Sequence, residues 1–249
     1  MKIIKATWEN RNLGRDAYEV TLDRKDLRDF DATLAELHAQ NFAGAYVVIK
    51  MPVGDIKALH ALEDDGFRFM ETQFHITDYF EPKETPDETA NLMKNAERII
   101  VPKERTEWER IISKITPDMF DTDRISLDPL LGKEMACRRY QNWCRDLFEN
   151  PHSWMWVMKV DGQEVSFGLN IRDEEKQTDD GILGGVFAEF KNEGYGIFQS
   201  CNNNKKNKVK GKTVISSNNT AMLRIYQHFG MIIIKELYVL RKIYAKKNL

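Results

Sequence analysis

The stretch Val186-Phe-Ala-Glu-Phe-Lys-Asn-Glu-Gly-Tyr-Gly-Ile197 is the most informative segment of this 249-residue chain. It contains the end of an expected strand (181–188) and the start of an expected helix (196–207). Glycines permit tight conformations and a close approach of the backbone to a ligand. Unpaired amides at a helix N-terminus, aided by the helix dipole, favour a phosphate or pyrophosphate there. Taken alone, Gly194-Tyr-Gly196 fits a simple turn at least as well, because it lacks the third glycine of a dinucleotide fingerprint and the Gly-Lys-Ser/Thr ending of a P-loop.

A second segment, Val214-Ile-Ser-Ser-Asn-Asn-Thr-Ala-Met-Leu-Arg-Ile-Tyr-Gln-His-Phe-Gly-Met231, reads as a strand, an amide-rich cap and a helix that ends in glycine. Asn219 and Tyr226 are seven residues apart. Seven residues are two helical turns, so both side chains are expected on the same side of that helix. Without the first segment, Tyr226 would read as a core residue of an amphipathic helix.

Together the two segments resemble the GCN5-related N-acetyltransferase (GNAT) superfamily. The phosphate loop of that family, Arg/Gln-x-x-Gly-x-Gly/Ala, is matched by Lys191-x-x-Gly194-x-Gly196, with lysine as its first residue. The later signature of the family is an Asn, a Tyr seven residues on, and a Gly that is usually followed by Phe. Its counterparts here are Asn219, Tyr226, Gly230 and Met231. The resemblance covers residues 97–249, with methionine in place of the usual phenylalanine.

The resemblance implies an α/β fold with a mixed central sheet and splayed strands, acetyl-CoA as cosubstrate, and no metal. It implies that Tyr226 is the catalytic residue, a general acid toward the departing thiolate, and that Asn219 fixes the cofactor. A phenol of pKa about 10 can donate a hydrogen bond or a proton as a thiol of pKa about 8.5 is released. Backbone amides at the splayed strand are expected to polarise the thioester carbonyl and to hold the pantetheine arm: Val186, Phe187 and Ala188. The pyrophosphate is expected on the phosphate loop: Lys191, Asn192, Glu193, Gly194, Tyr195, Gly196 and Ile197.

The segment Phe80–Thr89 has two prolines, five charges and no apolar period, which is typical of a linker. It divides the chain into an expected N-terminal α/β domain (1–90) and an expected GNAT catalytic domain (91–249). The first half has no Gly-x-Gly loop but ends like the second in helix, glycine and apolar strand, so it resembles a smaller, degenerate copy of the same fold. This two-part arrangement is similar to acetyltransferases of nucleotide-linked amino sugars, the dTDP-fucosamine type.

The charge balance and the cysteines limit the functional classes. There are 37 basic and 39 acidic residues, a net charge of −2, which disfavours a nucleic-acid partner. The three cysteines form no Cys-x-x-Cys pair, which argues against a metal site or a disulfide framework and favours a reducing cytoplasm. The N-terminus lacks the apolar core of a signal peptide, and no apolar run is long enough to span a membrane.

The sequence therefore predicts a cytoplasmic acetyl-CoA-dependent N-acetyltransferase that acts on a small-molecule primary amine by direct attack in a ternary complex. A nucleotide-linked amino sugar is one candidate acceptor. Transfer to a peptide or protein amine and a non-catalytic acyl-CoA-binding module stay open as alternatives, as does a homodimer. The acidic stretch 172–180 reads as a solvated hairpin loop, and the sequence does not select a general base among its carboxylates.

Overall fold

The computed structural model describes residues 1–78, 94–199 and 209–246. These residues form two compact units, of which the first comprises 1–74 with 235–249 and the second 75–234. Strands β4 (Arg68–Thr77) and β10 (Ile232–Ile243) each begin in one unit and end in the other. The boundary expected near residue 90 falls outside the described residues. From Lys235 onward, β10 belongs to the first unit.

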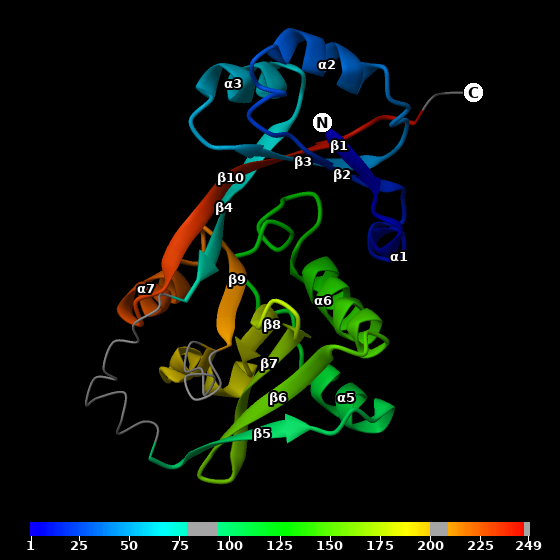
Figure 1. Cartoon of the computed structure of the whole chain (residues 1–249). Coiled ribbons are helices and arrows are strands. Elements are labelled where there is room, and N and C mark those ends of the chain that lie inside the picture. The colour runs from blue at the N-terminus through cyan, green and yellow to red at the C-terminus, as the bar shows by residue number, and fades with distance from the viewer. Residues whose placement is uncertain (79–93, 200–208, 247–249) are drawn as a thin grey trace. The chain divides into compact units, whose positions relative to one another are not determined.

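The first unit is a mixed sheet with helices on it. Its strand order is β1-β2-β3-β10-β4, in which β2 is parallel to β3 and the pairs β1–β2 and β3–β10 are antiparallel. Helices α2 and α3 lie on one side of this sheet (Figure 1), where Leu37 and Leu62 join a buried cluster with Val47, Ile49 and Leu240. The other elements of the unit are β1 (Lys2–Lys5), η1 (Thr7–Glu9), α1 (Asn10–Leu13), β2 (Ala17–Thr21), α2 (Phe30–His38), β3 (Tyr46–Pro52) and α3 (Ile56–Asp64).

Helices α2 and α3 begin at aspartates that cap them. Asp29 accepts a hydrogen bond of 3.2 Å from the amide of Ala32, and Asp55 accepts one of 3.0 Å from the amide of Ala58. Each carboxylate satisfies one of the amides that have no partner within the first turn of a helix.

The second unit contains a mixed sheet in the order β9-β8-β7-β6-β5, whose pairs are antiparallel except for the parallel pair β8–β9. The end of β4 lies beside β9, where the hydroxyl of Thr77 donates to the carbonyl oxygen of Gly211 at 3.0 Å. The elements are β5 (Ala96–Val101), α5 (Arg105–Ile112), α6 (Lys133–Phe148), β6 (Ser153–Val160), β7 (Gln163–Asp173), β8 (Thr178–Val186), η2 (Ala188–Phe190), η3 (Tyr195–Gln199), β9 (Lys210–Ser216) and α7 (Thr220–His228).

The two faces of this second sheet carry different elements. Helices α5 and α6 lie on one side, and η3 and α7 lie on the other (Figure 1). Trp156 and Met158 of β6 pack with Phe198 of η3. We call the face of the sheet that carries these side chains the η3 face; it also includes the residues paired with them on the neighbouring strand. Side chains of the alternate positions belong to the opposite face, which we call the α6 face.

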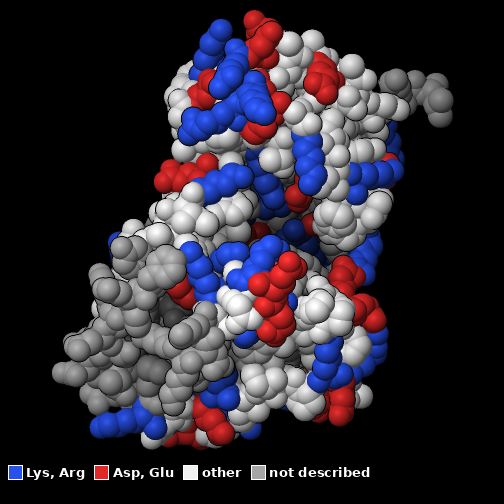
Figure 2. Space-filling view, viewed as in Figure 1, with Lys and Arg blue, Asp and Glu red and all other residues white. Residues whose placement is uncertain are grey.

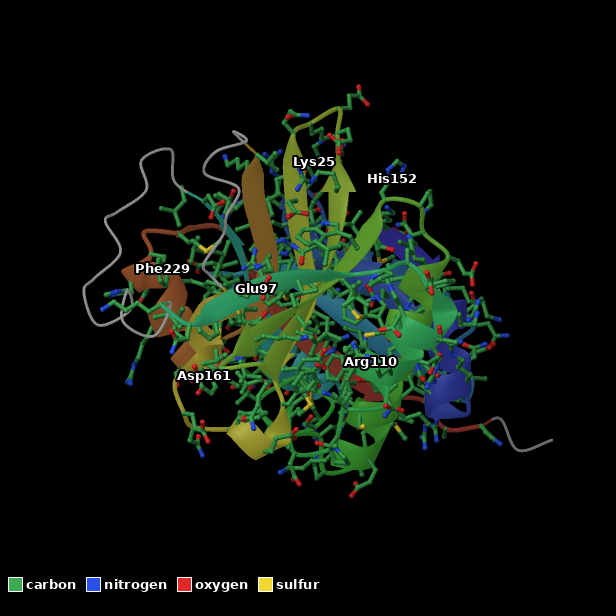
Figure 3. All side chains as sticks on the ribbon, turned by 90° about the horizontal axis from the view of Figure 1, so that it is seen from below. Lys25, Glu97, Arg110, His152, Asp161 and Phe229 are labelled. Atoms are coloured by element: carbon green, nitrogen blue, oxygen red, sulfur yellow. The ribbon has the colours of Figure 1, made fainter. Side chains whose placement is uncertain are left out.

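Helix α5 is tied to the β6–β7 hairpin by ion pairs. Arg110, labelled in Figure 3, and Lys114 each lie 2.8 Å from the carboxylate of Glu164. Although burial opposes it, these two hydrogen-bonded cations keep the pKa of Glu164 below its usual value. The pairs hold the helix in position along the sheet.

The acidic stretch 172–180 is mostly strand, and the expectation of a solvated loop was wrong there. Strand β7 extends to Asp173 and β8 begins at Thr178, so only residues 174–177 form the turn. Asp179 is buried, and its carboxylate accepts hydrogen bonds of 3.0 and 3.3 Å from Trp154 and Asn170. A run of charges indicates a solvated segment only when its members lack such partners.

Two other elements differ from expectation. The α-helix expected to start at Gly196 begins as the 3-10 turn η3, and its expected remainder after Gln199 lies outside the described residues. The two final strands expected at 232–237 and 239–244 form the single strand β10.

Basic and acidic side chains are intermixed over the face seen in Figure 2, in keeping with the net charge of −2. Cys137 and Cys144 are free thiols buried on α6, and burial raises the pKa of Cys144 to about 12. Cys201 lies outside the described residues. Within the described ranges, no helix combines the length and the apolar character that crossing a bilayer requires.

Candidate functional site

Strands β8 and β9 run in parallel and then separate. Their ladder extends from Thr178 opposite Lys210 to Gly181 opposite Thr213. At this last rung the hydroxyl of Thr213 donates a hydrogen bond of 3.0 Å to the carbonyl oxygen of Gly181. Both strands continue beyond it, β8 to Val186 and β9 to Ser216, outside their common ladder. We call the rung Gly181–Thr213 the fork.

Strand β8 has an extra residue directly after the fork. Asn170 of β7 lies opposite Gly181, whereas its neighbour Leu169 lies opposite Leu183, which leaves Ile182 unmatched. Such a bulge interrupts the ladder and redirects backbone groups. Strand β8 therefore loses its regular pairing with β7 and its pairing with β9 at the same place, directly after Gly181.

The backbone amide of Val186 points into the space between the separated strands. The amide of Phe187 donates to the carbonyl oxygen of Val165 on β7 at 2.9 Å, and Val186 is opposite Ser166. In an antiparallel ladder this geometry makes Val186 a non-hydrogen-bonded position, whose amide is directed away from β7. Three residues were expected to offer backbone amides to the cofactor. Val186 directs its amide toward β9, whereas Phe187 donates its amide to β7 and Ala188 begins η2.

The glycine-rich loop follows η2 and leads into η3. Asn192 and Gly194 have φ angles of 72° and 85°, in the left-handed region that favours glycine. A Cβ atom at Gly194 would have nothing within 4 Å, whereas one at Gly196 would lie 3.6 Å from Ile225 and 3.8 Å from Met222 of α7. Gly194 therefore borders open space, and Gly196 packs the loop on α7. The other expected residues of the loop are Glu193 in the turn and Tyr195 and Ile197 in η3.

Lys191, at the start of the loop, is bound to the connection between α5 and α6 (113–132). Its ammonium group donates to the carbonyl oxygen of Asp118 at 2.9 Å and lies 2.7 Å from the carboxylate of Asp121. The same connection covers β8, since a Cβ atom at Gly185 would lie 3.3 Å from both Met119 and Phe120. Lys191, the first residue of the glycine-rich loop, and the α6 face of β8 thus contact the same segment.

Helix α7 carries Asn219 and Tyr226 as expected. Asn219 is its N-cap and accepts a hydrogen bond of 3.2 Å from the amide of Met222. Tyr226 is half-buried and forms a hydrogen bond with Thr213. Burial raises the pKa of Tyr226 to about 12. The phenol is therefore protonated at neutral pH and is located at the fork.

Solved structures share this architecture. A GCN5-related N-acetyltransferase from Sphaerobacter thermophilus matches with a TM-score of 0.57 over 100% of this chain and 78% of that chain, at 14% identity. The chain has the GNAT fold. The expected fold class, with its mixed sheet and splayed strands, is confirmed.

Two further structures agree with the fold at similarly low identity. A functionally unknown conserved protein from Staphylococcus epidermidis matches with a TM-score of 0.58, 14% identity, and coverage of 92% of this chain and 85% of that one. A Drosophila protein matches with a TM-score of 0.51, 11% identity, and coverage of 93% and 72%. No family model and no curated protein matches the sequence.

Sequence reasoning missed Thr213 and the bulge at Ile182. Thr213 is a β-branched residue within an expected strand, and only its place at the last rung of the ladder distinguishes it. The bulge follows from the register of β7 against β8, which is a non-local property. Neither leaves a local signal in the sequence.

Proposed function

We propose that this chain is an acetyl-CoA-dependent N-acetyltransferase whose acceptor is a small-molecule primary amine, attacked directly in a ternary complex. The observation that carries the proposal is the phenol of Tyr226 at the fork of β8 and β9, bonded to Thr213. A thioester inserted between the separated strands would have its sulfur beside a neutral hydrogen-bond donor. All residues of the proposed site belong to the second unit.

The backbone of β8 supplies the amide hydrogen-bond donors of the proposed site. The amide of Val186 faces the space that β9 vacates, but it lies five residues beyond the fork, at about 3.3 Å per residue, so its proposed partner is the pantetheine arm. The bulge at Ile182 directly follows the fork, where the thioester carbonyl would lie. Fixed amides directed at a carbonyl oxygen stabilise the negative charge that develops there during attack by an amine. In this proposal β8 also holds the amides of the pantetheine arm, as an added strand would.

The glycine-rich loop from Lys191 to Ile197 is the proposed pyrophosphate site. Gly194 borders open space, so an anion can approach its backbone closely. Asn219 already caps α7 through its side chain, and its proposed contribution to the cofactor is to fix the start of that helix, two turns before Tyr226.

Tyr226 assists departure of the thiolate. With a pKa of about 12 the phenol keeps its proton, and in this proposal its O–H turns from Thr213 toward the sulfur as coenzyme A leaves as a thiolate. A charge-assisted hydrogen bond from a neutral donor to a developing anion is about twice as strong as a neutral one. The stabilisation is larger in the transition state than in the ground state, which is the requirement for a gain in rate.

The test combines calorimetric titration with acetyl-CoA and release of free thiol over a panel of amines: aliphatic amines, a nucleotide-linked amino sugar and a peptide with a free N-terminus. Binding together with turnover of a small amine supports the proposal. Turnover of the peptide alone would replace it with a peptide acetyltransferase. Binding without any turnover would replace it with an acyl-CoA-binding module, and absence of binding would overturn it.

A further inference from the structure

The carboxylates of the β7–β8 hairpin differ in what they contact. Glu174 and Glu175 are exposed in the turn, and Asp173 is paired with Lys176 at 2.6 Å. Asp179 is buried, and its carboxylate accepts a hydrogen bond of 3.0 Å from Trp154. Each of these four carboxylates is exposed to solvent, paired with a lysine or hydrogen-bonded to a donor.

Asp180 differs from these four in one atom. Its Oδ1 atom is buried and has no hydrogen-bond partner among the described residues, while the residue as a whole is half-buried and its charge acts on Lys176. An unpartnered buried carboxylate oxygen is costly for a folded protein and calls for a functional explanation.

The register places Asp180 next to the fork. It lies opposite Lys212 of β9, one rung before Gly181 and Thr213. Consecutive rungs are about 3.3 Å apart along a parallel strand. Asp180 is thus within one residue of the point at which the proposed thioester would enter the sheet.

Asp180 and Tyr226 approach the fork from opposite faces. Asp179 shares the η3 face with Trp154, which donates to it, so Gly181 and its partner Thr213 also belong to that face. Tyr226 is bonded to Thr213 and therefore lies on the η3 side. By alternation Asp180 belongs to the α6 face. A thioester held between them would have a proton donor on one side and a proton acceptor on the other.

We infer that Asp180 is the general base of the proposed transferase, an assignment that rests on the proposed function. The free amine attacks the thioester carbonyl, and its nitrogen becomes acidic as the C–N bond forms. Asp180 accepts the proton from that nitrogen, the C–S bond breaks, and the thiolate departs beside Tyr226. The proton held by Asp180 then passes to solvent, and the thiolate takes one from solvent, so the products are the amide and free coenzyme A.

The test compares Asp180→Asn, Asp180→Ala and the matched control Glu175→Ala, an exposed carboxylate of the same hairpin. The assay is thiol release with the best small amine for the wild type, accompanied by calorimetry with acetyl-CoA and thermal melting. Both Asp180 variants are expected to lose about 10²-fold in kcat while keeping acetyl-CoA affinity, as for loss of a general base. The Glu175→Ala variant is expected to match the wild type.

Added formate gives the readout that a structural role would not change. Formate fits the space of the missing carboxylate in Asp180→Ala and is expected to restore turnover in a concentration-dependent manner, without effect on Asp180→Asn, where the amide fills that space. Asp180→Asn turnover close to that of the wild type would overturn the assignment and leave the proposed transferase intact. A loss in Asp180→Ala that formate does not restore would also overturn it. Absence of turnover by the wild type with every amine would remove the proposed function itself.

Discussion

The side chains of Tyr226 and Thr213 form a hydrogen bond at the last rung of the β8–β9 ladder. Thr213 in turn donates to the carbonyl oxygen of Gly181 on the opposite strand at 3.0 Å. The hydroxyl groups of Tyr226 and Thr213 thereby connect α7, β9 and β8 at the point where β8 and β9 separate.

Replacing Tyr226 with Phe should lower kcat by about 10²-fold, because the proposed thiolate loses its hydrogen-bond donor. Acetyl-CoA affinity should change much less, since the hydroxyl acts mainly as charge develops on sulfur. Single-turnover kinetics and calorimetry measure the two effects separately. Turnover close to that of the wild type, with chemistry rate-limiting, would return Tyr226 to a role in packing.

Replacing Thr213 with Val should lower kcat by about 10-fold, less than the change at Tyr226, because it removes the positioning partner and leaves the donor in place. Thr213→Ser keeps the hydroxyl and is the matched control, with turnover close to that of the wild type. The double variant with Tyr226→Phe should be no slower than Tyr226→Phe alone, since the two residues act as a unit. Full additivity in this cycle would contradict the coupling.

Replacing Gly194 with Ala should weaken acetyl-CoA binding by about 10-fold or more, since a methyl group would enter the open space above the loop and φ of 85° disfavours alanine. Gly162→Ala is a matched control, because Gly162 also has a positive φ of 82° and nothing within 4 Å of its Cβ position. It follows Asp161, labelled in Figure 3, at the β6–β7 turn. Both variants should lose similar stability in melting experiments, and only Gly194→Ala should lose affinity.

Gly196→Val tests the same loop less cleanly. Its side chain would press on Ile225 and Met222, at 3.6 and 3.8 Å from the Cβ position, and so disturb the helix that carries Tyr226. For this reason Gly194 is the better position at which to separate cofactor binding from the geometry of α7.

Replacing Asp121 with Asn should strengthen coenzyme A binding by a few-fold at low salt. In the structure Lys191 lies 2.7 Å from Asp121, so a pyrophosphate must compete with that carboxylate for the same ammonium group. Because both side chains are partly exposed, the gain should be about 1 kcal/mol or less and should decline as salt screens the charges. Calorimetry at two salt concentrations checks this, and affinity that falls in Asp121→Asn would show that the pair supports the binding loop.

The phenol of Tyr226 should titrate near pH 12, above the ordinary tyrosine pKa of about 10. The difference in tyrosinate absorbance between the wild type and Tyr226→Phe measures this titration. Because the pKa is raised by folding, the contribution of Tyr226 to stability is complete below about pH 10 and is lost as the pH rises toward 12. Tyr226→Phe should therefore lose less stability than the wild type over that interval. A midpoint near the ordinary value would show that the phenol is solvated.

The local patterns of the sequence determined several parts of the protein. The amide-rich cap and the seven-residue spacing predicted α7, which begins at Asn219 and carries Tyr226. The glycines and the end of the preceding strand predicted the loop from Lys191 to Ile197, and the two motifs together predicted the fold class. These features depend on capping, helical period and backbone freedom, which act over a few residues and are therefore legible in the sequence.

Only the tertiary structure decided where the chemistry-bearing groups meet. The fork at Gly181 and Thr213, the bulge at Ile182 and the choice of Asp180 over its neighbouring carboxylates all follow from the register between strands. Register depends on pairing between residues that are distant in sequence, and a shift of one residue would exchange the two faces of a strand. For this reason the charges of 172–180 read as a solvated loop in the sequence, whereas in the folded sheet Asp179 is buried with hydrogen-bond partners and Asp180 has one buried carboxylate oxygen without a hydrogen-bond partner beside the fork.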